Sequence, residues 1–401
     1  MQLEVTTVVL LLSFFVAFIM GLVANKTNFC TMGAVSDWVN MGDTGRMGAW
    51  MLSIGIAIAG VLLLQYIYDI PLDSTLPPYL TSNFGWLRYL LGGFMFGVGM
   101  TLASGCGNKT MVNIGGGNLK SLVVLVVAGI FAYLMTKTSF YEVLFHGWVT
   151  ATTVDLTSYE IHSQSLDSVL LSVFGLSNKV FLHWLTGLLL MSLFFFVAFR
   201  SKDLRSTPHN IIGGFVIGLA IVAGWYITGG ALGQEAIETV EWLDERPVGV
   251  GIQSYTFINP MGETVSYLMD PANTLLITFG VVAVAGVITG SFIASVFSRR
   301  FKIIWFYDTE DMLKHLSGAA LMGIGGVLGM GCTIGQGITG VSTLSVGSLL
   351  VLGSIIFGSV LTMKIMYYKL VYEDASFIES LITSLVDLKL LSEKLRKLEK
   401  L

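Results

Sequence analysis

The feature that most constrains this chain is a run of 48 residues, Leu316 to Met363, without a single Asp, Glu, Lys or Arg. A helix crosses the hydrocarbon core of a bilayer with about 20 apolar residues. The run is therefore long enough for two membrane-spanning helices with a glycine-rich reversal between them. Charged residues make up only 12% of the 401 residues, whereas soluble domains average about 25%. We therefore predict an all-α integral membrane protein.

Seven further stretches lack charged side chains and complete a prediction of about nine transmembrane helices. They are Val5–Asn25, Met47–Tyr68, Tyr89–Asn108, Ser121–Thr136, Val180–Phe199, Asn210–Gln234 and Pro271–Ser298. Ser121–Thr136 is the shortest of them. The first run has neither a basic region before it nor a small-residue cleavage site, which predicts a retained helix and not a signal peptide.

Lys and Arg gather in the cytoplasmic segments of membrane proteins, and their placement here predicts the orientation. With the N-terminus outside, all of them fall on the cytoplasmic side except Arg88, Lys137, Lys179 and Arg246. We therefore expect the C-terminus in the cytoplasm. Two polar segments, Lys137–Lys179 and Glu235–Asp270, then form outward loops. No basic cluster alternates with aromatic residues, which excludes a nucleic-acid partner.

The segment from Glu373 to the end has leucines at helical spacing with Lys and Glu between them. These leucines are Leu381, Leu385, Leu388, Leu391, Leu395 and Leu398. The spacing predicts an amphipathic cytoplasmic helix that lies on the membrane surface or packs against a partner.

An internal repeat divides the chain into two halves. One pair of matching segments is Gly97-Val98-Gly99 with Gly105-Cys106 and Gly323-Ile324-Gly325 with Gly331-Cys332, and Gly92 aligns with Gly318 at the same offset. A second pair is Phe29-Cys30-Thr31 and Tyr226-Ile227-Thr228. Each half holds four spans, and the fifth helix between them makes the second half run in the opposite direction. We expect a first membrane repeat at 1–136, an outward loop and linking helix at 137–209, a second, inverted repeat at 210–366 and a tail at 367–401. Inverted repeats are a recurring plan among transporters.

The three cysteines occupy equivalent positions of this repeat: Cys30, Cys106 and Cys332, with Ile227 at the fourth. Glycines such as Gly105 and Gly331 flank them, which predicts broken or re-entrant helices that are tolerated where they line a cavity. A single buried cysteine is usually a small hydrophobic residue, but three equivalent ones favour a function.

The other side chains narrow that function. The five histidines lack the spacing of metal ligands, so we expect no metal and no cofactor; a Cys/Met path for Cu(I) is a minor alternative. The spans contain no ionisable Asp, Glu, Lys or Arg, which favours passive passage. Lys109, three residues after Cys106, either attracts an anion near the mouth of a path or anchors the helix end.

The motifs around Cys30, Cys106 and Cys332 resemble those of the YeeE/YedE family of sulfur-transport membrane proteins, over most of Leu3–Met363. The resemblance implies an inverted-repeat helical fold in the inner membrane and the transport of thiosulfate, without enzymatic activity. It also implies that the three cysteines line a narrow central path on which neutral thiols hand the anion along.

Three alternatives stay open at this point. A membrane sulfurtransferase would form a persulfide on a reactive cysteine, and Cys106 near Lys109 comes closest to that requirement. A transporter could instead carry another sulfur or a selenium anion. An anchor subunit could use its tail to recruit a soluble partner, such as a small cytoplasmic sulfur-carrier protein.

Overall fold

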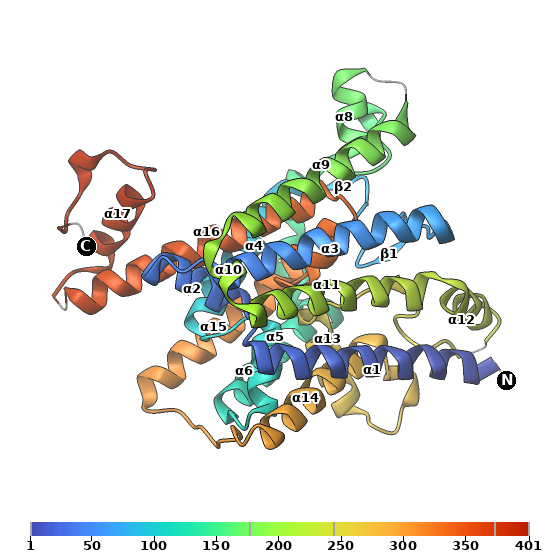
Figure 1. Ribbon diagram of the computed structural model, residues 1–401, viewed down its shortest axis with the longest axis horizontal. Coiled ribbons are helices and arrows are strands. Elements are labelled where there is room, and N and C mark those ends of the chain that lie inside the picture. Colours follow the sequence, from blue (N-terminus) through green and yellow to red (C-terminus); the bar gives the residue numbers. More distant parts are fainter. Residues whose placement is uncertain (1, 176–177, 244, 373, 400–401) are drawn as a thin grey trace.

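The computed structural model describes residues 2–175, 178–243, 245–372 and 374–399 and is almost entirely helical. Long helices run side by side along the long axis of the molecule (Figure 1). They are α1 (Gln2–Thr27), α3 (Gly45–Tyr68), α4 (Trp86–Leu102), α6 (Leu119–Lys137), α9 (Lys179–Arg200), α11 (Pro208–Gly229), α14 (Phe279–Phe297), α15 (Thr309–Leu328) and α16 (Val346–Val371).

Among the described residues, eight helical stretches are long and apolar enough to cross a membrane. Helix α15 is the ninth long helix. It carries Glu310, Asp311 and Lys314 in its first turns, so its apolar part is shorter. The predicted all-α membrane fold is confirmed, and Ser121–Thr136 lies within α6.

Short elements fill the connections and the ends of the long helices. The short helices are α2 (Thr31–Met41), α5 (Gly107–Gly115), α7 (Gly147–Thr152), α8 (Leu166–Phe174), α10 (Lys202–Ser206), α12 (Ala231–Glu241), α13 (Ile258–Met269) and α17 (Phe377–Asp387). Single turns of 3₁₀ or π helix are η1 (Glu142–His146), η2 (Leu156–Tyr159), η3 (Thr274–Leu276), η4 (Gly335–Gly340) and η5 (Glu393–Leu395). Strand β1 (Thr75–Leu76) pairs in parallel with β4 (Ile252–Gln253), and β2 (Asn83–Phe84) pairs antiparallel with β3 (Val154–Asp155).

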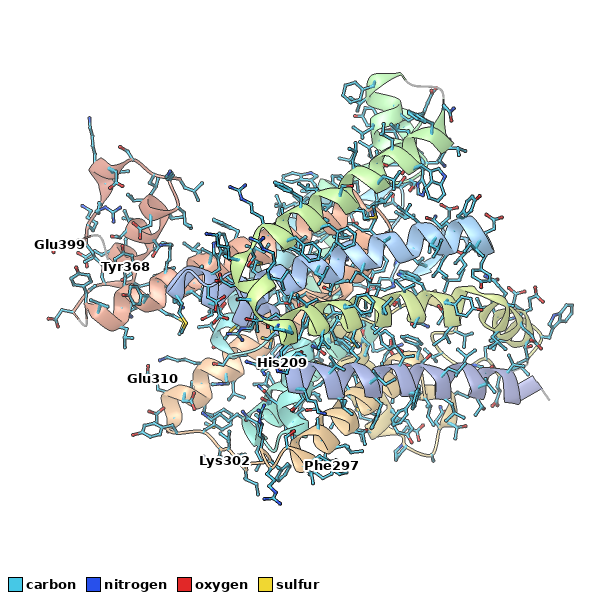
Figure 2. The ribbon with its side chains drawn as sticks, in the orientation of Figure 1. His209, Phe297, Lys302, Glu310, Tyr368 and Glu399 are labelled. Atoms are coloured by element: carbon cyan, nitrogen blue, oxygen red, sulfur yellow. The ribbon has the colours of Figure 1, made fainter. Side chains whose placement is uncertain are left out.

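The two chain ends lie at opposite ends of the long axis (Figure 1). The charged side chains of Lys302 and Glu310 lie toward the same end as the C-terminal tail (Figure 2). This arrangement places the α14–α15 connection and the tail at one end of the helical body.

Three predicted spans end or begin elsewhere in the structure. Tyr89–Asn108 and Asn210–Gln234 are each interrupted, because α4 ends at Leu102 and α11 ends at Gly229. Pro271–Ser298 is too long, since α14 begins only at Phe279. The side chain of Thr278 accepts a hydrogen bond from the Val281 amide and caps that helix, as hydroxyl residues do at helix N-termini.

The polar segment Glu235–Asp270 is not a loop throughout. Its second half forms α13, which packs against α6 and α14. The first turn of α13 is buried, including Ile258 and Met261, and an added Cβ at Gly129 of α6 would come 2.9 Å from the Met261 carbonyl oxygen. The sequence prediction missed this helix because Glu263 and Asp270 lower the mean hydropathy of a segment whose apolar residues sit on one side.

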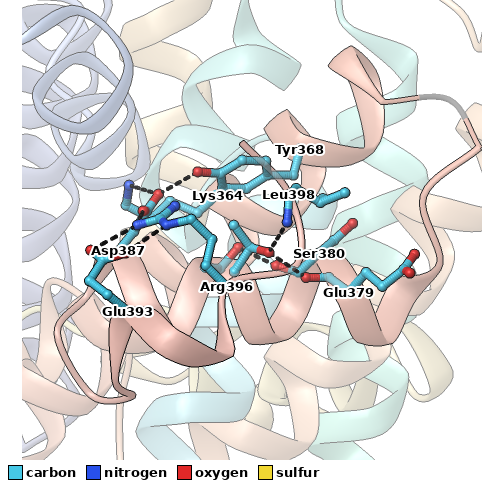
Figure 3. Close-up of polar contacts among 10 residues, drawn as sticks. Lys364, Tyr368, Glu379, Ser380, Asp387, Glu393, Arg396 and Leu398 are labelled. Atoms are coloured by element: carbon cyan, nitrogen blue, oxygen red, sulfur yellow. Dashed lines mark hydrogen bonds and ion pairs between the residues drawn. The ribbon is translucent and has the colours of Figure 1, made fainter. Parts of the chain in front are cut away.

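The tail helix is shorter than predicted. Helix α17 ends at Asp387, and Lys389 adopts a left-handed φ of 60° that turns the chain back. Figure 3 shows the Asp387 carboxylate between Lys364, Tyr368 and Arg396, with its oxygens 2.7 Å from the tyrosine hydroxyl and 2.8 Å from the guanidinium. Leu388, which caps the helix, and the leucines from Leu391 onward therefore lie outside α17. Glu373 lies outside the described residues.

Glycines bring α4 and α15 into close contact. An added Cβ at Gly92 would come 2.9 Å from the Gly325 carbonyl oxygen, and one at Gly318 would come 2.7 Å from the Gly99 carbonyl oxygen. The two helices therefore run antiparallel. In the sequence repeat Gly92 corresponds to Gly318, and Gly99 corresponds to Gly325. The contact of Gly92 with Gly325 is therefore the repeat equivalent of the contact of Gly318 with Gly99.

Candidate functional site

Each cysteine lies at a break between two helical segments. Cys30 is the N-cap of α2, and its sulfur accepts a hydrogen bond from the Gly33 amide at 3.2 Å. Cys106 is the N-cap of α5. Cys332 precedes η4, and its sulfur accepts from the Gly335 amide at 3.4 Å. The predicted interruptions at the cysteine motifs are thus present, and all three thiols are buried and free.

The breaks before Cys106 and before Cys332 occupy equivalent positions of the sequence repeat, and each contains a residue with left-handed backbone. Ser104 has a φ of 56° and Met330 a φ of 59°, at positions separated by the repeat offset. Gly331 has a φ of 158°, a conformation that side chains rarely allow. No positive φ occurs at Gly105, where an added Cβ would make only an ordinary contact 3.4 Å from Lys109 Cγ.

The breaks bring the three cysteines together although they are far apart in the sequence. The side chains of Cys30 and Cys106 lie within hydrogen-bonding range of each other. The side chain of Thr333, the residue after Cys332, lies next to the Cys106 sulfur. Cys106 is also close enough to Cys332 for their charges to interact, so the thiols form one buried cluster.

Lys109 lies beside this cluster. Its ammonium donates a hydrogen bond to Asn28 Oδ1 at 2.5 Å and so ties α5 to the break between α1 and α2. Its positive charge also acts on Cys30. The structure thus gives Lys109 both an anchoring contact and a place near the thiols.

A cavity lies beside each of the left-handed breaks. The first has a volume of about 400 Å³ and is lined by Arg88, Thr256, Glu263 and Met330, among others. The second, of about 650 Å³, is lined by Met32, Ser104, Lys314 and others. We call them the Arg88 cavity and the Lys314 cavity. Because α4 and α15 are antiparallel, their C-terminal breaks and the two cavities face opposite ends of the helical body.

The sequence analysis missed several polar residues around the thiols. Thr31, Asn108, Thr256 and Thr333 are buried, and their side-chain polar atoms have no hydrogen-bond partner in the described part of the chain. The available signal was the Cys-Thr pair that occurs at residues 30–31 and again at 332–333. In the same described part of the chain, no group of three or more His, Cys, Asp or Glu side chains could hold a metal ion.

The fold defines a multi-pass helical membrane protein, and a buried cluster of thiols lies at the breaks of its helices. The family model for sulphur transport matches residues 26–361, and the chain belongs to this family. The chain is 26% identical to the thiosulfate transporter TsuA of Escherichia coli (strain K12) over 80% of its length and 84% of the relative. It is also 26% identical to the thiosulfate transporter TsuA of Spirochaeta thermophila, over 84% of its length and 92% of the relative.

Proposed function

We propose that this protein moves thiosulfate, or a closely related small sulfur anion, across the inner membrane along a path lined by Cys30, Cys106 and Cys332. The observation that carries the proposal is the buried cluster of three free thiols, together with a cavity beside each left-handed break, at Met330 and at Ser104. The two relatives named as thiosulfate transporters support the choice of anion.

The chemistry of the thiols suits this anion. Thiosulfate has a soft terminal sulfur and a sulfonate-like end, and a neutral thiol is a weak hydrogen-bond donor. Successive weak sites favour conduction, because a tight site would retain the ion. A thiolate would repel the anion, so the proposal requires the thiols to stay neutral. Cations line both cavities, Arg88 in one and Lys314 and Lys369 in the other, and they attract an anion toward the path. Each cavity also has one carboxylate, Glu263 or Glu310, and Glu310 is paired with Lys314 at 2.6 Å.

We also propose that the path lies between two inverted repeats, residues 1–136 and 210–366. In the proposed repeat α1, α3, α4 and α6 correspond to α11, α14, α15 and α16. The contact of α1 with α14 then corresponds to that of α11 with α3, and the contact of α4 with α16 corresponds to that of α15 with α6. All four of these contacts are present. The antiparallel contact of α4 with α15 supports a two-fold axis in the membrane plane. In this arrangement the Arg88 cavity opens outside and the Lys314 cavity opens to the cytoplasm, next to the tail.

Uptake of radiolabelled thiosulfate into proteoliposomes tests the proposal. We expect uptake by the wild type and a large loss in Cys106→Ala, because Cys106 interacts with both of the other cysteines. Cys30→Ala and Cys332→Ala are expected to lose less. Thermal unfolding of each variant in detergent checks that the loss is not due to misfolding.

Two results would contradict the proposal. Absence of saturable uptake by folded wild type would exclude thiosulfate, and normal uptake by all three alanine variants would exclude the thiol path. Mass spectrometry after exposure to thiosulfate adds a chemical check, since a persulfide on Cys106 would indicate sulfur transfer in place of passage.

A further inference from the structure

The threonines around the thiols differ from the other buried threonines of this protein. Buried hydroxyl and amide groups are nearly always hydrogen-bonded, and most buried threonines here follow that rule. Thr101, Thr110 and Thr339, for example, donate to the carbonyl oxygens of Gly97, Cys106 and Tyr255. Among the described residues, the buried threonines whose hydroxyls have no oxygen or nitrogen partner are Thr31, Thr256 and Thr333, and the Thr333 hydroxyl faces the Cys106 sulfur.

These three hydroxyls follow the cysteines. Thr31 is 1% exposed and adjoins Cys30, whereas Thr333 is 0% exposed, adjoins Cys332 and lies next to the Cys106 sulfur. Thr256 lines the Arg88 cavity, and its Oγ1 would lie 2.2 Å from an added Cβ at Gly335, whose amide donates to Cys332.

Asn108 adds an amide to the same region. It lies two residues after Cys106 in α5 and is 1% exposed, and neither its Oδ1 nor its Nδ2 has a partner in the described residues. Each cysteine therefore has an unpaired buried hydroxyl or amide close to it. A path lined by thiols alone would not need these groups.

We propose that Thr31, Asn108, Thr256 and Thr333 bind the oxygen atoms of the transported anion while the thiols contact its terminal sulfur. The inference rests on the proposed transport of thiosulfate and assigns its selectivity. Hydroxyl and amide groups donate well to charged oxygen acceptors, whereas thiols are weak donors. The path then selects anions that carry both a terminal sulfur and oxo groups, and anions with only one of these features bind more weakly.

Substitutions at Thr333 separate hydrogen bonding from packing. Valine keeps the shape of threonine and removes the hydroxyl, and serine keeps the hydroxyl and leaves a small gap. We expect Thr333→Val to raise the KM for thiosulfate about ten-fold, the size of one lost hydrogen bond to a charged group, and Thr333→Ser to stay near the wild type. A packing role predicts the reverse order. Thr31→Val and Thr31→Ser repeat the comparison at the threonine next to Cys30.

Thr110 supplies the matched control, because it is buried in the same helix as Asn108 and its hydroxyl is already paired with the Cys106 carbonyl oxygen at 3.1 Å. Thr110→Val should change KM less than three-fold. Inhibition by thiocyanate, which has a sulfur and no oxygen, should be equal in the wild type and in Thr333→Val.

The inference is overturned if Thr333→Val and Thr31→Val raise KM no more than Thr110→Val, or if the serine variants are the more impaired ones. If Thr333→Val weakens inhibition by thiocyanate as much as it weakens thiosulfate uptake, the inference is also overturned, since the hydroxyl would then bind an anion without oxygen. Absence of uptake by the wild type would instead contradict the proposed function itself, so the two failures are distinguishable.

Discussion

The glycine contact between α4 and α15 gives a quantitative test of how the two halves pack. In Gly318→Ala the new Cβ would lie 2.6 Å from the Ala103 nitrogen and 2.7 Å from the Gly99 carbonyl oxygen. Both atoms belong to the backbone of α4, so no side-chain rotation relieves the contact. Ordinary contacts begin near 3.4 Å, and the helices must therefore separate by about 0.7–0.8 Å. Overpacking of this kind costs roughly 1–3 kcal/mol.

Gly353→Ala is the matched control. Gly353 lies in the interior of α16, is exposed, and would place its Cβ with no atom within 4 Å. Both substitutions gain the same helix propensity, about 0.8–1.0 kcal/mol for alanine over glycine. The two variants should then differ by the contact cost alone, about 1–3 kcal/mol.

Thermal unfolding of the purified protein in detergent measures that difference. We expect Gly318→Ala to unfold several degrees below Gly353→Ala. Gly92→Ala makes the equivalent contact on α15, 2.4 Å from the Gly329 nitrogen, and should be destabilised by a similar amount. Equal midpoints for Gly318→Ala and Gly353→Ala would refute the reasoning, and a large effect at only one of Gly92 and Gly318 would argue against the two-fold arrangement.

Four further predictions concern the tail and the Lys314 cavity. Asp387→Ala leaves Arg396 and Lys364 without this carboxylate, so trypsin should cleave the tail at least ten-fold faster. An unchanged cleavage rate would show that the contacts of Asp387 with Lys364 and Arg396 do not hold the tail. Burial opposes the charge of Asp387, but hydrogen bonds from Tyr368 and Arg396 outweigh it and hold the pKa of this carboxyl below its usual range. The stabilisation is therefore complete above about pH 4 and is lost as the pH falls through the lowered pKa. Cleavage of the tail by an acid-stable protease should rise only in that acidic range. The tail helix α17 packs against the end of α16, so deletion of residues 373–401 should leave at least half of the proteoliposome uptake. Lys314→Gln should lower the uptake rate more at low salt than at high salt, because salt screens the attraction between this cation and the anion.

Hydropathy predicted the membrane helices well because it depends on local sequence. Ser121–Thr136 lies inside α6, and Val180–Phe199 lies inside α9. The tail and α13 were predicted less well, since their ends depend on contacts distant in sequence. Helix α17 ends where Asp387 meets Lys364 and Arg396, and α13 is a helix that α6 and α14 cover.

The candidate site was predictable in part for the same reason. The repeat offset identified Cys30, Cys106 and Cys332 and the breaks beside them, because glycine and left-handed backbone are encoded locally. The neighbours of the thiols were not predictable. Whether a threonine hydroxyl pairs with a carbonyl of its own helix, as in Thr110, or has no partner, as in Thr333, depends on the packing around it.

By itself the sequence determined the class of protein, the number of long helices within about one, and the three residues on which the proposed transport depends. These properties follow from the cost of placing charges in hydrocarbon and from the conformational freedom of glycine, which act over a few residues. Only the tertiary structure decided that Cys30 and Cys106 meet and that a cavity lies beside each break. It also decided that unpaired hydroxyls accompany the thiols. Those features depend on which elements the tertiary packing brings together, and no local pattern encodes which side chains meet there.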